Sequence, residues 1–244
     1  MRLAQISRYP IKAIGVEDLD SATLEAGQRL AGDRLWAVAH EAAKAGPQGW
    51  AACRNFIRGA SSPRLMAITC ETRGDAITLR HPDQPDITVT LPADAGALIA
   101  WLAPLADPGR AAPDRLVAAP EGMTDQAAPW LSILSQSSLD ALSKAAGHPM
   151  ARARFRANLW LEGGKPWEEF DWVGKHLRIG DAELRITEPI TRCTATHADP
   201  ATGERDTDTL QLLEQNWGHR DFGVFAEVTR SGSLQTGDTV EPLP

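Results

Sequence analysis

Four Gly-Asp pairs divide much of this chain into short β-rich runs. The pairs stand at residues 32–33, 74–75, 180–181 and 237–238. Gly-Asp favours tight turns, so each pair predicts a connection into a strand, and residues 76–80 and 182–187 alternate apolar and polar side chains accordingly. Further strands are expected at residues 2–9, 35–39, 65–69, 87–91, 115–119, 159–162, 176–179 and 223–230. Their number favours a mainly β, barrel-rich architecture.

Helices are expected to be few. They are predicted at residues 93–103, 137–146 and 208–216. In the second of these, Leu139 and Leu142 share one helical face, and Gly147 supplies a stop signal. Residues 103–129 are rich in Ala, Pro, Gly and Asp, which predicts a domain boundary near residue 125. The expected fold is α+β, mainly β with a few helices, in domains 1–125 and 126–244.

Length, charge and cysteine content narrow the class of protein. The 244 residues contain no run of about 20 apolar residues and no apolar core of a secretory signal near Met1. We therefore expect a cytoplasmic protein without a membrane span. The net charge of −7 argues against nucleic acid as a partner. Three cysteines, an odd number, support no disulfide framework and are expected to be reduced thiols.

The net charge is distributed unevenly along the chain. Residues 1–120 carry 13 basic and 13 acidic side chains, whereas residues 121–244 carry 12 basic and 19 acidic side chains. The whole excess of −7 therefore lies in the second half. An acidic surface there is expected to attract a protein partner of opposite charge.

Cys193 is the most distinctive candidate for chemistry. A β-like run ending at Ile190 leads to Arg192 and Cys193, and a Pro/Gly-containing turn follows. A guanidinium favours the neighbouring thiolate, so Cys193 is placed to act as a nucleophile or a soft-metal ligand. The alternative is a small apolar residue packed in the core. A zinc site or a Cys–His pair with His197 and His219 is a further alternative, although no fourth zinc ligand is evident.

A second candidate is an array of arginines in the second half. Arg152, Arg154 and Arg156 alternate along the chain shortly before Asn158. In an extended segment the three guanidiniums would share one face, which suits a phosphate or another oxyanion. The alternative is a solvated strand edge whose charges prevent aggregation.

Five short motifs together resemble the MOSC family of molybdenum-cofactor-binding domains, which are related to the C-terminal part of molybdenum cofactor sulfurase. They are Tyr-Pro-Ile-Lys at 9–12, Gly-Asp-Arg-Leu-Trp at 32–36, Arg-Phe-Arg-Ala-Asn at 154–158, Arg-Cys-Thr-Ala-Thr at 192–196 with Asp-Pro-Ala-Thr-Gly at 199–203, and Phe-Gly-Val-Phe at 222–225. The resemblance implies an N-terminal β-barrel-like domain, residues 1–125, packed on a MOSC β-barrel domain, residues 126–244.

The resemblance also implies roles for individual residues. It makes Cys193 the protein thiolate ligand of molybdenum in a Mo-molybdopterin cofactor, whose dithiolene supplies the other sulfur ligands. Residues implied to hold the pterin and its phosphate are Lys12, Arg34, Arg156 and Asn158, with Arg54 as a looser match. Thr191 and Arg192 flank the ligand and are expected to tune the metal through hydrogen bonds. Ala13 and Phe225 depart from the family pattern.

Ser137 precedes the predicted helix 137–146 together with Ser135 and Ser138. The ordinary role of such serines is helix capping. The alternative is that this helix start binds the cofactor phosphate through its backbone N–H groups.

The implied activity is the reduction of N-hydroxylated substrates: hydroxylamines, amidoximes and N-hydroxylated bases. The chain has no ferredoxin-like cysteine cluster and no flavin fingerprint. Electrons are therefore expected from external proteins: a flavin reductase, a ferredoxin- or cytochrome-type carrier, or both, docking on the acidic half. The alternatives are a carrier of the molybdenum cofactor or of sulfur, and an interaction module that has lost its cofactor.

Overall fold

Fifteen strands and three α-helices form the described part of the chain, residues 1–46 and 48–243, in a computed structural model. The expected mainly β fold with a few helices is confirmed. The helices are α1 (Ala95–Leu102), α2 (Gln136–Ala146) and α3 (Thr209–Trp217). The strands are β1 (Arg2–Arg8), β2 (Glu17–Leu19), β3 (Ser21–Leu24), β4 (Trp36–His40), β5 (Thr69–Arg73), β6 (Ala76–His81), β7 (Gln84–Thr90), β8 (Pro113–Ala118), β9 (Trp130–Ser135), β10 (Leu159–Glu162), β11 (His176–Ile179), β12 (Ala182–Thr191), β13 (Asp221–Arg230), β14 (Gly232–Gln235) and β15 (Val240–Leu243). Short 3₁₀ helices cover Cys53–Asn55, Pro63–Ala67, Ala103–Leu105, Arg152–Phe155, Glu168–Trp172 and Thr194–His197.

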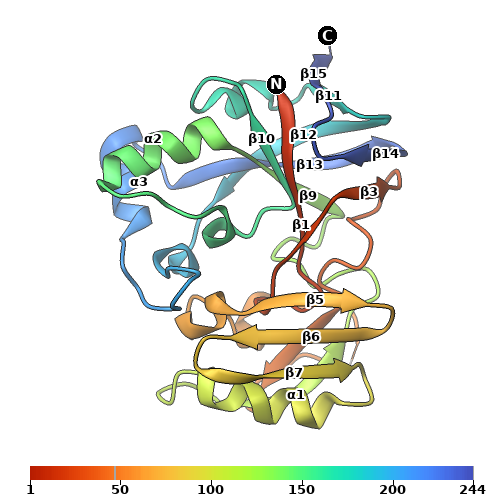
Figure 1. Cartoon of the computed structure of the whole chain (residues 1–244), viewed down its shortest axis with the longest axis vertical. Coiled ribbons are helices and arrows are strands. Elements are labelled where there is room, and N and C mark those ends of the chain that lie inside the picture. The colour runs from red at the N-terminus through yellow and green to blue at the C-terminus, as the bar shows by residue number, and fades with distance from the viewer. Residues whose placement is uncertain (47, 244) are drawn as a thin grey trace.

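The larger region is an eight-stranded sheet in the order β15-β11-β12-β13-β9-β10-β1-β2 (Figure 1). The β9–β10 pair is parallel, with Leu159 beside Ile133, and the other neighbours are antiparallel. Leu3 N donates to Asp238 O at 2.9 Å, which links β1 to the residues just before β15. The sheet therefore curls back on itself, although the described strands close no complete barrel.

The first strands of the chain extend the sheets of its second half. β1 lies between β10 and β2 in the large sheet, and β3 pairs with β14. The segment up to Leu24 is therefore joined by backbone hydrogen bonds to residues beyond 125. The domain boundary near residue 125 stays a prediction.

The side chains of β9 point alternately to the two faces of the large sheet. Leu131 and Ile133 belong to a fully buried apolar cluster with residues of β1, β10, β11, β12 and β13. The alternate residue Leu134 packs instead in a second cluster with Leu139 and Leu142 of α2. Because side chains alternate along a strand, Ser132 lies on this second side, where a cavity opens.

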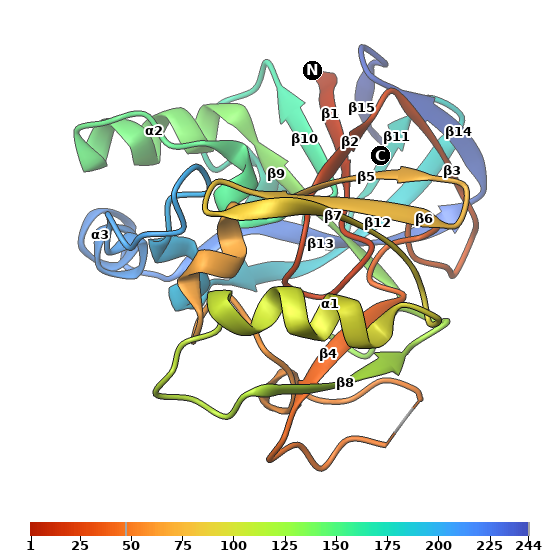
Figure 2. The same ribbon diagram turned by 60° about the horizontal axis from the view of Figure 1, so that its bottom comes forward.

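The smaller region contains the antiparallel sheet β5–β6–β7 and the β4–β8 pair. Figure 2 shows α1 lying between them. Leu98 and Leu102 of α1 pack with Leu79 of β6 and Val38 of β4 in one buried cluster. The β5–β6–β7 sheet and the β4–β8 pair are thus both packed against α1. This packing positions the loops that lead from them toward the large sheet.

One expected strand is wrong, and a central strand was not predicted. Residues 65–69 are mostly a 3₁₀ helix, Pro63–Ala67, because Pro63 fixes φ at the helix start and has no N–H for a sheet. The strand begins only at Thr69. The central strand β9 was missed because it is buried on both faces and shows no alternation of apolar and polar residues.

In the described residues, no helix has both the length and the apolar character needed to cross a bilayer.

Candidate functional site

A cavity of about 370 Å³, called here the central cavity, opens between the large sheet and the smaller region. Loops of the smaller region supply one side, and β9, β12 and the turn after β12 supply the other. The cavity is lined by seven of the nine predicted site residues: Lys12, Arg34, Arg156, Asn158, Thr191, Arg192 and Cys193. The fold thus brings together residues that are up to 181 positions apart in the chain (193 − 12).

Cys193 is an exposed free thiol at the start of the turn that follows β12. Its carbonyl oxygen accepts hydrogen bonds from Thr196 N at 3.1 Å and Thr196 Oγ1 at 2.9 Å. Arg154, only 2% exposed, donates to Thr196 O at 3.2 Å and forms a bidentate pair with Asp206 at 2.7 and 2.8 Å. The backbone of the turn is therefore held from inside the protein, which leaves the thiol of Cys193 available to the cavity.

Arg192, beside Cys193, is a guanidinium without an acidic partner among the described residues. Its Nη1 donates to Phe155 O at 2.9 Å and its Nε to Phe222 O at 2.8 Å. Burial lowers the pKa of Arg192 to about 10, so the group still carries its proton at neutral pH. Carbonyl oxygens satisfy its N–H groups but do not neutralise its charge.

Arg156 has the same kind of environment on another wall. It donates to Gly15 O at 3.2 Å, and its guanidinium carbon lies 4.3 Å from the centre of the Tyr9 ring. Burial lowers the pKa of Arg156 to about 10, and no described carboxylate forms an ion pair with it. A partly buried cation without an acidic partner is unfavourable, so the site favours an anionic ligand.

The Tyr9 ring also contacts Arg34, whose guanidinium carbon lies 4.5 Å from the ring centre. The phenol donates to Ala157 O at 2.9 Å, and burial raises the pKa of Tyr9 to about 12, so it stays neutral. Arg34 is paired with Asp33 and donates to Arg156 O at 3.1 Å. Tyr9 thus holds two guanidiniums through cation–π contacts at the same place in the cavity.

Lys12 is almost completely buried and reaches across to the segment before β9. Its Nζ donates to Met123 O at 3.1 Å and pairs with the carboxylate of Asp125. Desolvation raises the pKa of Asp125, whose side chain is 73% exposed, but the attraction of Lys12, Arg34 and Arg156 outweighs this and lowers the pKa below its usual value. Asp125 is therefore ionised at neutral pH and offsets part of the positive charge.

The central cavity is electropositive although the chain is acidic. Six basic side chains line it, namely Lys12, Arg34, Arg58, Arg154, Arg156 and Arg192, against two acidic ones, Asp125 and Glu188. Of these six, Lys12, Arg34 and Arg154 have carboxylate partners. The site therefore favours an anionic ligand.

Backbone strain is concentrated at the same place. The described residues other than glycine with positive φ are Ala13, Arg34, Arg156 and Trp167, and the first three line the central cavity. Such left-handed conformations are unfavourable and persist where surrounding contacts enforce them. At Arg34 and Arg156 the strained turn directs a guanidinium toward Tyr9.

Asn158 and Thr191 line the cavity but already have partners within the protein. Asn158 Oδ1 accepts from Ser132 N at 3.2 Å and Ser132 Oγ at 3.0 Å, while its Nδ2 donates to Ser7 O at 3.4 Å. Thr191 Oγ1 donates to Asp221 Oδ1 at 2.5 Å. Asn158 therefore joins β1, β9 and β10 at the cavity floor, in addition to any contact with a ligand.

The expectation that Arg152, Arg154 and Arg156 share one face is wrong. Residues Arg152–Phe155 form a 3₁₀ helix, so the three side chains point in different directions. Arg152 bonds Gln136 and Gln5, whereas Arg154 is buried against Asp206 and Thr196. In this array, Arg156 is the guanidinium that lines the central cavity without an acidic partner among the described residues.

Arg54 does not reach the central cavity. Its side chain is exposed, and its carbonyl oxygen contacts His40 Nε2. The 3₁₀ helix Cys53–Asn55 turns Cys53 inward and Arg54 outward. Arg58, four residues later, lies in the cavity lining instead.

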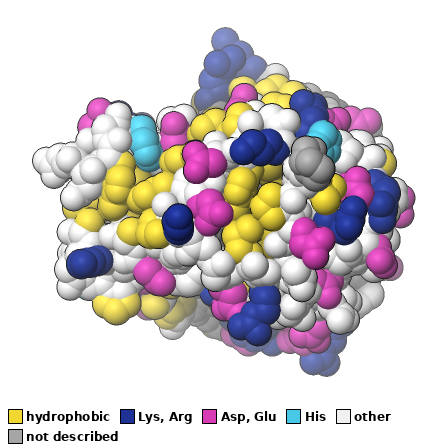
Figure 3. Space-filling view, turned by 90° about the horizontal axis from the view of Figure 1, so that it is seen from above, with side chains coloured by type: hydrophobic (Ala, Val, Ile, Leu, Met, Phe, Trp, Pro, Cys, Tyr) yellow, Lys and Arg dark blue, Asp and Glu magenta, His cyan; other side chains and the backbone are white. Residues whose placement is uncertain are grey.

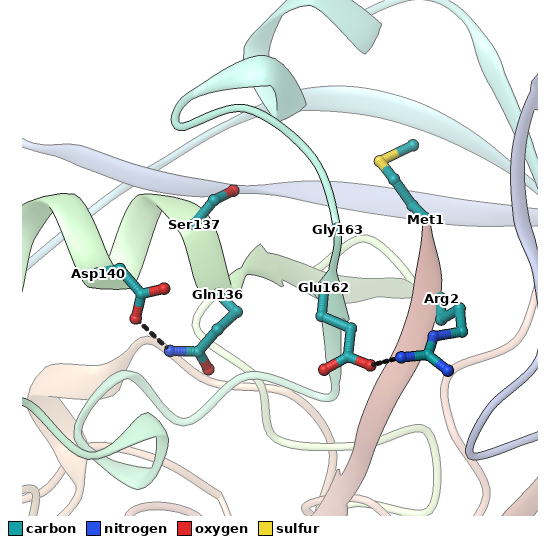
Figure 4. Close-up of a pocket in the computed structure, with 7 residues that line it drawn as sticks. All are labelled: Met1, Arg2, Gln136, Ser137, Asp140, Glu162 and Gly163. Carbon is teal, nitrogen blue, oxygen red and sulfur yellow. Dashed lines mark hydrogen bonds and ion pairs between the residues drawn. The ribbon is translucent and has the colours of Figure 1, made fainter.

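Ser137 lies in a different depression, called here the α2 hollow, between the start of α2 and β1 (Figure 4). It lies just beyond the end of β9, away from the Ser132 side of the cavity, and its hydroxyl pairs with Ser135 Oγ at 2.7 Å. The opposite charges of Arg2 and Glu162 pair at 2.9 Å in the hollow, and the carboxylate of Asp140 accepts from the Gln136 amide at 2.7 Å. The phosphate contact expected for Ser137 is therefore not supported.

The zinc alternative is also not supported. Within residues 1–46 and 48–243, no cluster of three or more His, Cys, Asp or Glu side chains could hold a metal ion. His197 lies 3.2 Å from Asp208, and His219 packs edge-on against Trp167 and Phe170.

Sequence reasoning missed several residues of the site. Tyr9, Cys53, Arg58 and Asp125 had no assigned role, yet Tyr9 holds two cavity arginines and the other three line the cavity. Tyr9 stands inside the Tyr-Pro-Ile-Lys motif, which was a usable signal. Arg58 and Asp125 reach the cavity only through loops whose path depends on the packing of the smaller region.

Comparison with known proteins assigns the chain to a family. A MOSC N-terminal beta barrel domain matches residues 1–136, more than half of the chain, and a MOSC domain matches residues 124–241. The chain belongs to the MOSC family. In this MOSC protein, the second match includes Cys193 and Arg192, and the first includes Lys12 and Arg34.

Individual relatives agree with this assignment. Mitochondrial amidoxime-reducing component 1 of Xenopus laevis is 22% identical over 98% of this chain and 81% of its own length. Molybdenum cofactor sulfurase of Anopheles gambiae is 40% identical over 30% of this chain, a match that covers only 9% of the sulfurase. The crystal structure of the YUAD protein from Bacillus subtilis matches 98% of this chain with a TM-score of 0.50 at 13% identity, which supports the fold alone.

Proposed function

We propose that this MOSC protein binds the molybdenum cofactor in the central cavity and reduces N-hydroxylated substrates. The observation that carries the proposal is the exposed thiol of Cys193 beside guanidiniums that lack acidic partners. The family supports the cofactor, and the name of the amidoxime-reducing relatives supports the reaction. The match to molybdenum cofactor sulfurase of Anopheles gambiae covers only 30% of this chain, so this relative says less about activity.

The residues present fit the chemistry of this cofactor. A thiolate is a soft ligand of the kind molybdenum accepts, and Cys193 is the cysteine exposed at the wall. A terminal phosphate needs charge-assisted donors, and Arg156 offers a guanidinium that no acid neutralises. Lys12 and Arg34 add donors from the opposite end of the chain.

The protein groups would bind, orient and shield the reacting centre. Bound there, the cofactor would supply the two-electron reduction of an N–O bond, for which the protein contributes position and electrostatics. Conversion of an amidoxime to an amidine consumes two electrons and two protons and releases one water. Arg154 and Thr196 would fix the backbone that carries Cys193, and Tyr9 would fix Arg34 and Arg156.

Metal content and turnover test the proposal. Protein from a molybdenum-replete host is expected to contain about one molybdenum per chain and to reduce benzamidoxime with reduced viologen. Cys193→Ser should lose the metal–thiolate absorption and nearly all turnover. Cys53→Ser, a thiol in the same cavity, should keep the metal and its absorption. Retention of full benzamidoxime reduction by Cys193→Ser would exclude Cys193 as the ligand.

The same experiment separates the competing functions. Bound molybdenum without benzamidoxime reduction would favour a cofactor carrier, and absence of molybdenum would favour an interaction module. An oxidoreductase needs an external electron donor, for which we propose a flavin reductase together with a ferredoxin- or cytochrome-type carrier. The cytoplasmic location stays a prediction.

A further inference from the structure

Residues 53–66 form the wall of the central cavity that lies against the Cys193 turn. Thr194 Oγ1 donates to Ala60 O at 3.5 Å, and a Cβ placed on Gly59 would lie 3.5 Å from Ala195 Cβ. Thr194 and Ala195 directly follow Cys193. A substrate that reacts beside Cys193 would therefore lie close to this wall.

Arg58 is the cation of this wall, and its hydrogen-bonding capacity is largely unused. Nη1 donates to Cys53 Sγ at 3.2 Å, and a thiol is a weak acceptor. No described carboxylate lies within ion-pair distance of the Arg58 guanidinium. The Arg58 carbonyl accepts from Ser61 N and Ser62 N at 3.0 and 2.8 Å, so its backbone is fixed.

Arg58 is separate from the cations proposed to hold the cofactor. Lys12 bonds Asp125, and Arg34 and Arg156 both contact Tyr9. Arg58 bonds to none of them and instead belongs to the segment in contact with Thr194 and Ala195. Arg58 is thus a further cation of the central cavity, outside the contacts that hold the other three.

We propose that Arg58 binds the carboxylate of an N-hydroxylated substrate, so that the preferred substrates of this protein are acidic. The proposal rests on the proposed function of the central cavity and names the substrate class for it. A guanidinium presents a planar fork that matches a carboxylate with two parallel N–H···O bonds. A neutral aromatic amidoxime lacks the group that this fork would bind.

Two matched substrates test the preference. The ratio of kcat/KM for 4-carboxybenzamidoxime to kcat/KM for benzamidoxime is expected to be well above one for the molybdenum-loaded wild type. Arg58→Gln should lower this ratio about ten- to hundredfold, the range for losing a hydrogen bond to a charged group. Arg58→Lys should restore part of it, because lysine keeps the charge but loses the fork. Arg54→Gln, an exposed arginine in the same segment, should leave the ratio as in wild type.

Binding without turnover gives a second readout. Calorimetry with 4-carboxybenzamidine and benzamidine, the two reaction products, should show tighter binding of the carboxylated product by wild type and Arg54→Gln. Arg58→Gln should lose this difference. If wild type binds both products equally, the proposal is overturned whether or not the protein has reductase activity.

The remaining outcomes also decide the matter. Equal kcat/KM ratios in wild type, Arg58→Gln and Arg54→Gln overturn the role of Arg58 and leave the proposed reductase intact. Loss of molybdenum from Arg58→Gln assigns Arg58 to the cofactor and overturns its role in substrate binding. If wild type reduces neither amidoxime, the proposed function fails, and calorimetry then shows independently whether Arg58 selects carboxylates.

Discussion

The central cavity and the α2 hollow differ in how their charges are satisfied. In the hollow, Arg2 pairs with Glu162 at the surface, and the carboxylate of Asp140 accepts a hydrogen bond from the Gln136 amide. The central cavity holds Arg156 and Arg192, which carry charge without an acidic partner among the described residues. Partly buried charge without an acidic partner, more than the presence of a depression, therefore distinguishes the central cavity as a binding site.

The largest expected difference concerns the ion pairs of the two regions. Asp206→Asn should lower the free energy of unfolding by about 3 kcal/mol, the low end for breaking a buried pair, because Asp206 is 35% exposed while Arg154 is 2% exposed. Glu162→Gln, which breaks the exposed Arg2 pair in the hollow, should cost less than about 1 kcal/mol. Chemical denaturation at neutral pH measures both. Equal losses of unfolding free energy in the two variants would show that burial does not strengthen the Arg154–Asp206 pair relative to the Arg2–Glu162 pair.

Acidification sharpens the same comparison. Partial burial raises the pKa of Asp206, but the hydrogen bonds and charge of Arg154 outweigh this and lower it below its ordinary value of 3.8. Its stabilising contribution is therefore complete above pH 3.8 and is lost as the pH falls through the lowered value. The stability difference between wild type and Asp206→Asn should be full at pH 6 and shrink below pH 3.8. A difference that grows on acidification would contradict the sign of this shift.

Cofactor retention should separate the arginines of the two regions. Arg156→Ala removes a donor to the proposed phosphate, and such a charge-assisted bond is worth about 1.5–3 kcal/mol, or a tenfold to hundredfold fall in cofactor retention. Arg2→Ala in the hollow should retain the cofactor as wild type does. Arg154→Ala should lose less than Arg156→Ala, because Arg154 is occupied by Asp206. Molybdenum per folded chain after gel filtration is the measurement.

These arginines also show what could be predicted from sequence. Most strand and helix types, and the gathering of Lys12, Arg34, Arg156 and Cys193 around one cavity, could be expected from the sequence motifs. The direction of each guanidinium could not, because it depends on the turn around Arg156 at φ 50° and on packing against Tyr9. The 3₁₀ turn Cys53–Asn55 likewise leaves Arg54 outside the cavity, whereas Arg58, which the motifs did not single out, lines it.

The smallest effect is expected at the outer surface, where a redox partner would dock. On the end of the molecule seen in Figure 3, acidic and basic side chains are interspersed with apolar ones. Glu169 is fully buried and bonds Ser138, so it takes no part in attraction, whereas Asp171 is exposed. Turnover with the native donor should fall modestly as salt shortens the Debye length from about 10 Å at 0.1 M to about 3 Å at 1 M.

Reduced viologen provides the control for this salt dependence. A small dye that reaches the cavity directly should be affected less by salt than the native donor. Asp171→Lys should slow the native donor only. Identical salt curves for both reductants would show that the acidic excess of the second half serves solubility and not docking.

The most direct measurement of the central claim is X-ray absorption at the molybdenum edge of the loaded protein. We predict three sulfur neighbours of molybdenum in wild type, two from the dithiolene and one from Cys193. Cys53→Ser, which changes the other cysteine of the cavity, should keep all three. Cys193→Ser should retain at most two. Three sulfur neighbours in Cys193→Ser, or only two in wild type, would contradict the account.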